Sequence, residues 1–188
     1  MTVRQITIYG HRALAQPTRK VREVTDDIRA LVADMYETMD AAEGVGLAAP
    51  QVGSRWRLFV YNCPDAEGVR RRGEVINPRL QRFGGLTLDE ETLEGCLSVP
   101  GEGFPTARHR GARVTGTDLR GAPVTIEDEG GILARALQHE VDHLDGSLYL
   151  DRLSPARRRE ALDAVTARGW RARGLLTWDP SRLAPDEV

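Results

Sequence analysis

The segment QHEVDH, residues 138–143, constrains this chain of 188 residues more than any other stretch. Residues four apart lie on one face of an α-helix with their Cβ atoms about 5–6 Å apart, so His139 and His143 can bind one divalent ion. Glu140 can then accept a proton from a water molecule on that ion without being a ligand. The sequence therefore predicts a metal-binding helix beside an apolar pocket. The alternative is three polar residues on a solvated helix face.

A catalytic metal site of this type needs a third protein ligand and one open coordination position. The candidates downstream of the helix are acidic. Upstream lies a cysteine, whose thiolate would be a strong ligand for a borderline-soft ion, although free cysteines are also common as small buried side chains. The residues alone leave the third ligand open among Cys96, Asp145, Asp151 and Glu160.

Two other histidines and one aspartate receive no role from this pattern. His11 and His109 lie in polar segments, which predicts surface loops rather than metal ligands. Asp142 falls at the margin of the histidine stripe. We expect it to be an ordinary exposed charge without a catalytic role.

The order of the predicted elements indicates an α+β fold, because strands precede and surround the metal-binding helix without strict alternation. Helices are expected over Thr25–Ala42, with Thr25 as N-cap, over Gly130–Gly146, and from Pro155 onward, with Ser154 as N-cap. Strands are expected over Trp56–Asn62, near Val75–Asn77 and, as a hairpin, over Arg113–Asp128. We expect one catalytic domain over residues 1–188, with an irregular tail from about residue 175.

Composition points away from several classes of protein. The formal net charge of −2 gives no global reason to expect binding to DNA or to a membrane. No run approaches the roughly 18 apolar residues of a membrane span, and the first residues lack the apolar core of a signal peptide. Two cysteines are too few for a secreted disulfide framework. We expect a cytoplasmic protein in a reducing compartment.

Three blocks stand in order along the chain: GVGLAAPQ at residues 44–51, EGCLS at residues 94–98 and QHEVDHLDG at residues 138–146. Together they resemble the three signature motifs of the peptide deformylase family, whose members remove the N-formyl group from nascent bacterial polypeptides. The resemblance covers roughly residues 5–165. It implies mostly antiparallel sheets around a central metal-binding helix, with a helix towards each end of the chain.

The same resemblance implies how the site works. Cys96, His139 and His143 are expected to bind one divalent metal ion, which is Fe²⁺ in the cell, with Zn²⁺, Ni²⁺ or Co²⁺ as alternatives in purified protein. A metal-activated water would attack the formyl carbon of an N-formylated nascent peptide, and formate would leave. Glu140 would act as general base and then as general acid.

Further residues receive roles from the resemblance. The side-chain amide of Gln51 and the backbone N–H of Leu97 are expected to stabilise the oxyanion. Gly44 and Gly46, which lack a Cβ, permit unusual φ values and a close approach of the substrate backbone. The residues expected to bind or surround the substrate are Val45, Gly46, Leu47, Glu94, Ile132 and Ala136.

One departure from the family pattern concerns the segment 101–110. Many members have a Val-Pro-Arg triplet there, whereas this chain reads FPTARHR, with the proline moved to Pro105. The geometry of this loop therefore stays open, and we assign no substrate contact to Arg108.

Two other functions fit parts of the pattern. A metalloprotease would use Asp151 or Glu160 as third ligand and would not need Cys96. A structural protein would close the site with Cys63 as a fourth ligand. A disulfide between Cys63 and Cys96 is disfavoured in a reducing cytosol.

The segment 154–174 is basic, with six arginines against two acidic residues. Since nascent peptides emerge from the ribosome, this helix is a candidate for docking on ribosomal RNA through phosphate contacts. A solvated arginine face is the alternative.

Overall fold

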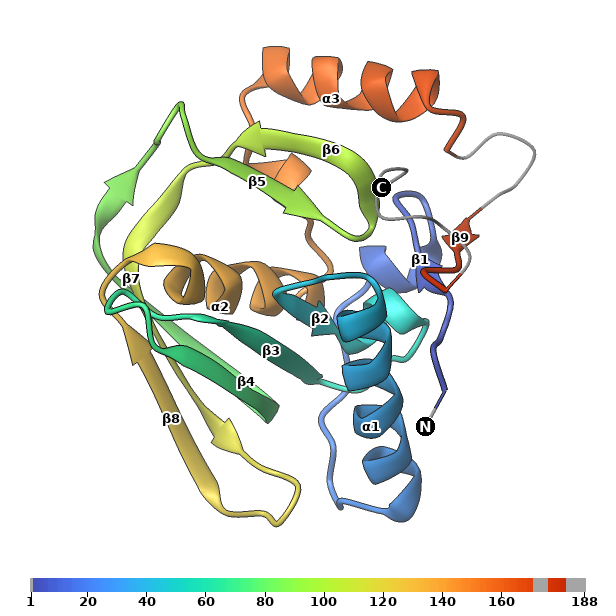
Figure 1. Ribbon diagram of the computed structural model, residues 1–188, viewed down its shortest axis with the longest axis vertical. Coiled ribbons are helices and arrows are strands. Elements are labelled where there is room, and N and C mark those ends of the chain that lie inside the picture. Colours follow the sequence, from blue (N-terminus) through green and yellow to red (C-terminus); the bar gives the residue numbers. More distant parts are fainter. Residues whose placement is uncertain (1, 171–175, 182–188) are drawn as a thin grey trace.

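A five-stranded antiparallel sheet and the helix α2 (Gly131–Leu144) form the centre of the computed structural model, which describes residues 2–170 and 176–181 (Figure 1). The sheet has the order β2-β3-β4-β7-β8. Its strands are β2 (Gly46–Ala48), β3 (Leu58–Pro64), β4 (Arg70–Thr87), β7 (Arg108–Thr117) and β8 (Pro123–Asp128).

Both faces of this sheet are covered, and β3 shows this directly because successive side chains of a strand point to opposite faces. Phe59 and Tyr61 belong to the apolar cluster that contains the residues of α2. Leu58 and Val60 belong instead to the cluster formed with α1 (Asp26–Ala41). The sheet therefore holds α2 on one face and α1 on the other.

The helix α1 forms for the reasons predicted from the sequence. Thr25 is the N-cap, and its hydroxyl accepts a hydrogen bond from the N–H of Ile28. Acidic residues occupy the first turn, where they interact favourably with the helix dipole. The apolar residues that recur at helical spacing are the buried ones: Ile28, Leu31, Val32, Met35 and Met39.

A second, two-stranded sheet lies over the other side of α2. It consists of β5 (Leu93–Cys96) and β6 (Val99–Pro105), and α3 (Pro155–Ala167) packs on β6 (Figure 1). The predicted start of α3 is confirmed, with Ser154 accepting a hydrogen bond at the N-cap from the N–H of Arg157. The metal-ligand candidates on α2 thus lie between two sheets.

A third pair of strands joins the two ends of the chain. The strand β1 (Ile6–Thr7) pairs antiparallel with β9 (Thr177–Trp178). The expectation of an irregular tail from about residue 175 is therefore wrong for these two residues, because Trp178 is buried against β1. The rest of that expectation, for residues 182–188, lies outside the described residues. Short 3-10 helices complete the fold: η1 (Arg12–Ala15), η2 (Ala49–Val52) and η3 (Tyr149–Arg152).

The predicted hairpin over Arg113–Asp128 is confirmed by the pairing of β7 with β8. The strand predicted near Val75–Asn77 is only part of β4, which has 18 residues. The pairing of β4 with β7 shifts register twice, next to Asn77 with φ 53° and at Gly84 with φ 72°. These two irregularities interrupt the alternation of side chains along the strand, so an alternation pattern in the sequence does not predict its full length. None of the described helices is long and apolar enough to cross a membrane.

Candidate active site

The helix α2 is buried on nearly all sides. From Leu133 to Leu144 every residue except Arg135 is buried. His139, Glu140 and His143 are 8%, 3% and 0% exposed. The alternative of a solvated helix face is therefore wrong, since three buried polar side chains must find partners inside the protein.

Three potential ligand atoms converge between α2 and the end of β5. The Sγ atom of Cys96 lies 3.2 Å from Nε2 of His143, which in turn lies 3.2 Å from Nε2 of His139. All three atoms lie within 4.8 Å of one another. A thiolate and two imidazoles suit a borderline-soft divalent ion, and three protein ligands leave one coordination position for water or substrate.

The other candidates for the third ligand are engaged elsewhere. Asp145 and Asp151 form exposed ion pairs with arginines, and Glu160 is exposed on α3. Cys63 is fully buried in β3, and burial raises the pKa of its thiol to about 12. Both cysteines are free, and Cys63 does not belong to the convergent group, so neither the disulfide nor the closed four-residue site is supported.

Glu94 orients one of the histidines. Its Oε1 atom lies 2.7 Å from Nδ1 of His139, and its Oε2 atom accepts a hydrogen bond of 2.9 Å from Nε of Arg108. Burial opposes ionisation of Glu94, but these partners outweigh it and hold the pKa of the carboxyl well below its usual range. An ionised Glu94 accepts the proton of Nδ1, so Nε2 of His139 keeps its lone pair for a metal ion.

Arg108 belongs to a buried ionic network rather than to the cleft. It is 4% exposed and bridges Glu94 to Asp142, with 2.5 Å between Nη1 and Oδ2 of Asp142. Asp142 also accepts hydrogen bonds from Arg152. The prediction that Asp142 is an exposed charge is therefore wrong, because it is 3% exposed.

Only a weak signal in the sequence points to this network, namely that Asp142 shares a helix turn with His139. The two other histidines stay outside the convergent group, as predicted. The prediction of a surface loop is wrong for His109, which lies in the strand β7. His11 caps the 3-10 helix η1.

Glu140 lies against β2, where only glycine leaves room for it. A Cβ atom at Gly46 would come within 2.8 Å of the carboxyl carbon of Glu140. Neither Gly44 nor Gly46 has a positive φ, so neither uses the unusual φ values that glycine permits. Close approach to Glu140 is the reason for glycine at position 46. The Oε2 atom of Glu140 has no hydrogen-bond partner among the described residues, and burial is the main cause that raises its pKa to about 7.

Gln51 and Leu97 lie next to Cys96 and line the same cleft as Glu140. The Oε1 atom of Gln51 accepts a hydrogen bond of 2.8 Å from the N–H of Ala48. This bond directs Nε2 towards β5, 3.3 Å from Oγ of Ser98 and 3.7 Å from Sγ of Cys96. Leu97 follows the candidate ligand Cys96 directly and borders the same cleft. A side-chain amide and a backbone amide thus lie close to the same candidate ligand.

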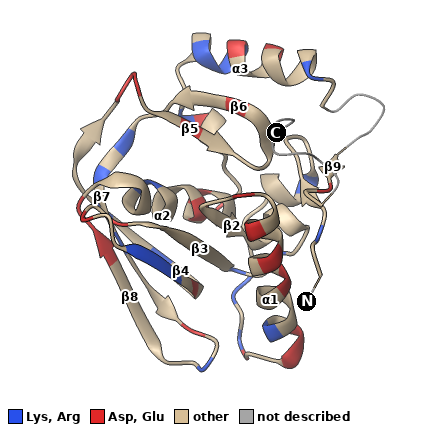
Figure 2. Ribbon diagram, viewed as in Figure 1, with Lys and Arg blue, Asp and Glu red and all other residues tan. Residues whose placement is uncertain are grey.

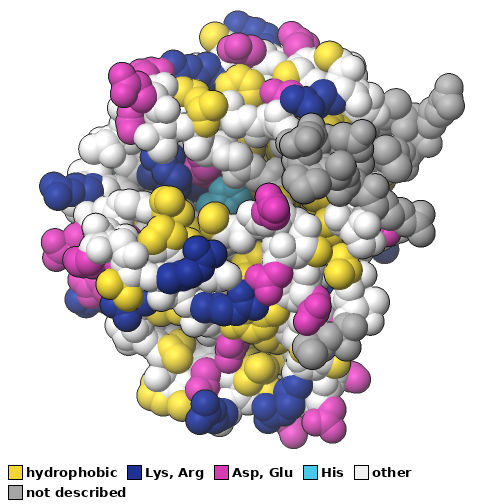
Figure 3. Space-filling view, in the orientation of Figure 1, with side chains coloured by type: hydrophobic (Ala, Val, Ile, Leu, Met, Phe, Trp, Pro, Cys, Tyr) yellow, Lys and Arg dark blue, Asp and Glu magenta, His cyan; other side chains and the backbone are white. Residues whose placement is uncertain are grey.

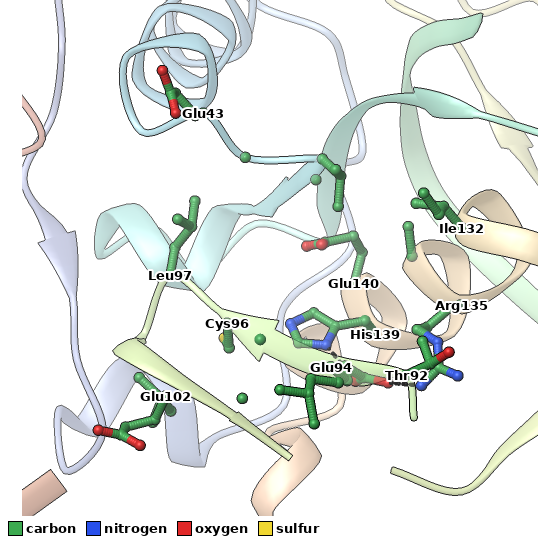
Figure 4. Close-up of a pocket in the computed structure, with 18 of the residues that line it drawn as sticks. Glu43, Thr92, Glu94, Cys96, Leu97, Glu102, Ile132, Arg135, His139 and Glu140 are labelled. Carbon is green, nitrogen blue, oxygen red and sulfur yellow. Dashed lines mark hydrogen bonds and ion pairs between the residues drawn. The ribbon is translucent and has the colours of Figure 1, made fainter. Parts of the chain in front are cut away.

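The ligand group opens into a cleft of ≈ 860 Å³. Figure 4 shows His139 and Glu140 between Leu97 and Ile132, and Figure 3 shows a histidine at the base of a depression with hydrophobic side chains beside it. The expected substrate-binding residues that line this cleft are Val45, Gly46, Glu94, Ile132 and Ala136. Leu47 does not line it, because its side chain is fully buried in the cluster beside α1.

An open three-ligand site with a carboxylate beside it is the arrangement of hydrolytic metalloenzymes. The comparisons narrow this class. A family model described as polypeptide deformylase matches residues 3–159, so the chain belongs to the polypeptide deformylase family and is an enzyme of that family.

A peptide deformylase of Mycolicibacterium smegmatis is 50% identical over 196 residues, which cover 99% of this chain and 98% of the relative. The crystal structure of the Ehrlichia chaffeensis peptide deformylase in complex with actinonin has a TM-score of 0.81 and 36% identity, and the match covers 90% and 99% of the two chains. A class I type b peptide deformylase of Acinetobacter baumannii, with Met-Ala-Ser bound, has a TM-score of 0.72 and 30% identity, with 81% and 99% covered.

Proposed function

We propose that this enzyme removes the N-formyl group from the N-terminal formylmethionine of newly made polypeptides by metal-dependent hydrolysis, with release of formate. The observation that carries this proposal is the convergence of Cys96, His139 and His143 at the base of an apolar cleft. Beside them lies Glu140, whose Oε2 atom has no hydrogen-bond partner among the described residues. The whole chain acts as one catalytic domain.

The ligand set fits a divalent ion, since one thiolate and two neutral imidazoles offer their free electron pairs to the same point. When bound, such an ion would act as a Lewis acid and would lower the pKa of a water molecule in the open position. This donor set does not select one metal. By family resemblance we propose Fe²⁺ in the cell, with Zn²⁺, Ni²⁺ and Co²⁺ as alternatives.

Glu140 moves the protons of the reaction. Its Oε2 atom is buried and unpartnered, so it is available to take a proton from the attacking water and to return one to the departing amine nitrogen. Nε2 of Gln51 and the N–H of Leu97 donate hydrogen bonds to the former formyl oxygen. The bond from Ala48 holds the Gln51 amide beside Cys96, so that Nε2 needs only to exchange a hydrogen-bond partner there to reach the oxyanion.

The cleft selects the first residue of the substrate. Val45 and Ile132 are 46% and 48% exposed at its mouth, and Ala136 lies deeper on α2. An apolar wall of this kind accepts methionine and discriminates only modestly against other unbranched side chains. The backbone of Gly46, on the edge strand β2, pairs with the extended substrate. The Met-Ala-Ser peptide bound to the Acinetobacter baumannii relative supports a methionine at this position.

The test is formate release from an N-formyl-methionyl peptide by protein loaded anaerobically with Fe²⁺. We expect Glu140→Gln to lower kcat by about 10²–10⁴-fold, the usual contribution of a positioned acid–base group. Glu160→Gln is the matched control, since this carboxylate is exposed on α3, and it should leave kcat unchanged. No formate release by wild-type protein with one metal ion bound per chain would refute the proposal.

The natural partners are N-formylated nascent peptides, so we propose that the enzyme works in the cytoplasm and docks on the ribosome through α3. Figure 2 shows arginines on α3 next to acidic residues, and several of them are paired: Arg157 with Glu90, Arg158 with Asp151 and Arg168 with Glu102. Arg159 is exposed, with no ion pair among the described residues.

Docking through phosphate contacts should be sensitive to salt. We expect the double change Arg158→Glu and Arg159→Glu to abolish co-sedimentation with ribosomes at low salt while leaving hydrolysis of a short peptide intact. Unchanged co-sedimentation would refute docking through α3 without affecting the proposed reaction.

A further inference from the structure

The turn that follows the ligand Cys96 is held from outside by the two ends of the chain. Cys96 pairs with Val99, so Leu97 and Ser98 form the two-residue turn of the β5–β6 hairpin. The pairing shifts register just before Cys96, where Gly95 pairs with Gly103. A turn next to an irregular pair has few ladder hydrogen bonds of its own, so its geometry depends on outside partners.

Those partners come from the β1–β9 pair. The indole Nε1–H of Trp178, in β9, donates a hydrogen bond of 2.8 Å to the carbonyl of Leu97. The N–H of Tyr9, which follows β1, donates one of 2.8 Å to the carbonyl of Ser98. Figure 1 shows β9 beside β1 at the end of the β5–β6 hairpin. Both carbonyls of the turn are therefore held by residues near the chain termini.

Trp178 is firmly placed for this role. It is 5% exposed and packs with Ile6 and Ile8, while the side chain of Leu97 contacts the same cluster. The register Ile6↔Trp178 and the hydrogen bond from the N–H of Ile8 to the carbonyl of Leu176 fix the backbone on either side. A buried indole N–H needs an acceptor, and here that acceptor is the Leu97 carbonyl.

The turn bears directly on the site. The N–H of Ser98 lies 3.4 Å from Sγ of Cys96 and donates a hydrogen bond to it. The carbonyl of Leu97 and the N–H of Ser98 belong to one planar peptide group, so the hydrogen bond from Trp178 also fixes the direction of the Ser98 N–H. The same bond anchors Leu97, whose own N–H belongs to the preceding peptide group. Under the proposed function, that N–H is one of the two oxyanion donors.

We propose that Trp178 is a positioning residue for the deformylation reaction: its indole N–H holds the Leu97–Ser98 turn so that the Leu97 N–H faces the oxyanion and the Ser98 N–H faces the thiolate. This inference rests on the proposed function. It extends the functional part of the chain beyond residue 159, where the match to the family model ends, to β9.

A second tryptophan provides a matched control. Trp170 donates its indole N–H to the carbonyl of Pro100, at 3.3 Å, on the same hairpin but beyond the turn. Trp170 packs against the same apolar cluster as Trp178 and Leu97, so Trp170→Phe makes the same change in ring size there and removes an indole–carbonyl hydrogen bond of the same kind, but it keeps the hydrogen bonds to the Leu97 and Ser98 carbonyls. Trp178→Phe removes the bond to Leu97 while keeping an aromatic ring in the cluster.

The experiment compares these two variants with the wild type in three measurements: formate release, the thiolate-to-metal charge-transfer absorption of Co²⁺-loaded protein, and amide hydrogen exchange of a peptide that contains residues 96–100. For Trp178→Phe we expect kcat to fall about threefold to tenfold, the effect of one lost hydrogen bond, with KM unchanged. We also expect a shifted absorption band and faster exchange. Trp170→Phe should keep the wild-type kcat and band.

Two results would overturn the inference: a wild-type kcat and band in Trp178→Phe, or an equal loss in both variants, which would indicate general support of the hairpin. If Trp178→Phe does not fold, benzothienylalanine at position 178 keeps the bicyclic shape without the N–H and gives the same comparison. Absence of formate release by the wild type would instead refute the proposed function, so the two failures are distinguishable.

Discussion

Arg108 and the arginines of α3 carry the same guanidinium group in opposite surroundings. Arg108 and its partner Glu94 are each 4% exposed, between β5, β7 and α2. Arg158 and its partner Asp151 are each 40% exposed. A buried pair is screened little by water, whereas an exposed pair gains little and loses side-chain freedom.

The number of arginines in a segment therefore says little about what each contributes to the stability of the protein or to the geometry of the site. The segment that contains α3 is conspicuously basic, yet its ion pairs lie at the surface. The buried guanidinium of Arg108 ties together two carboxylates, one of which orients the metal-ligand candidate His139. Four substitutions test this gradient, from the buried centre to the surface.

Replacing Arg108 with methionine should have the largest effect. The change leaves Glu94 and Asp142 buried without their shared cation, which should lower the free energy of unfolding by about 3–5 kcal/mol. Urea unfolding of the metal-free protein measures this loss. Arg158→Met is the control, and a midpoint for Arg108→Met equal to that of the control would contradict the comparison.

Replacing Glu94 with glutamine should weaken metal binding. The neutral side chain no longer favours a proton on Nδ1 of His139, so affinity should fall about 10–100-fold, as for other groups that orient a metal-ligating histidine. Competition with a chelator measures the affinity. Glu90→Gln removes an exposed carboxylate paired with Arg157 and should leave the affinity unchanged. Equal affinities in the two variants would show that Glu94 does not orient the site.

Replacing Arg152 with alanine should have an intermediate effect. Its side chain is 37% exposed, and Asp142 keeps Arg108 as a partner after the change. Solvent screening reduces what the pair contributes, so we expect a loss of about 1 kcal/mol in the free energy of unfolding. Urea unfolding measures this loss. A decrease in the free energy of unfolding as large as that of Arg108→Met would show that the exposed Arg152 contributes as much to the network as the buried Arg108.

Replacing Arg158 with alanine should have the smallest effect. An exposed ion pair between side chains that are each 40% exposed contributes little, so the free energy of unfolding should change by less than about 0.5 kcal/mol. The change should vanish at high salt. Thermal unfolding at low and high salt tests this. A decrease of more than about 2 kcal/mol in the free energy of unfolding would show that α3 depends on its ion pairs.

Local patterns predicted the local parts of the fold. The cap at Thr25, the start of α3 after Ser154 and the β7–β8 hairpin all follow from residues close together in sequence, and all are confirmed. The metal-ligand candidates on α2 also follow from local spacing. Cys96 was predicted as the third ligand only from the resemblance to the peptide deformylase family, because spacing alone also allowed three acidic residues.

Long-range contacts could not be predicted in this way. Arg108 meets Asp142 across 34 positions, and Trp178 meets Leu97 across 81. Nothing near Asp142 in the sequence distinguishes a buried aspartate from an exposed one. The tail looked irregular because two residues are too short for a strand pattern, although they pair with β1. Tertiary packing decided each of these features.

The contact between Gly46 and Glu140 makes the two positions epistatic. A side chain at position 46 requires the side chain at position 140 to move or to be shortened, and either change displaces the carboxylate that we propose as proton carrier. A substitution at either position should therefore lower the activity, whichever of the two is changed first, although 94 positions separate them in the sequence. In a library of variants selected for activity, glycine at position 46 and glutamate at position 140 should be retained together.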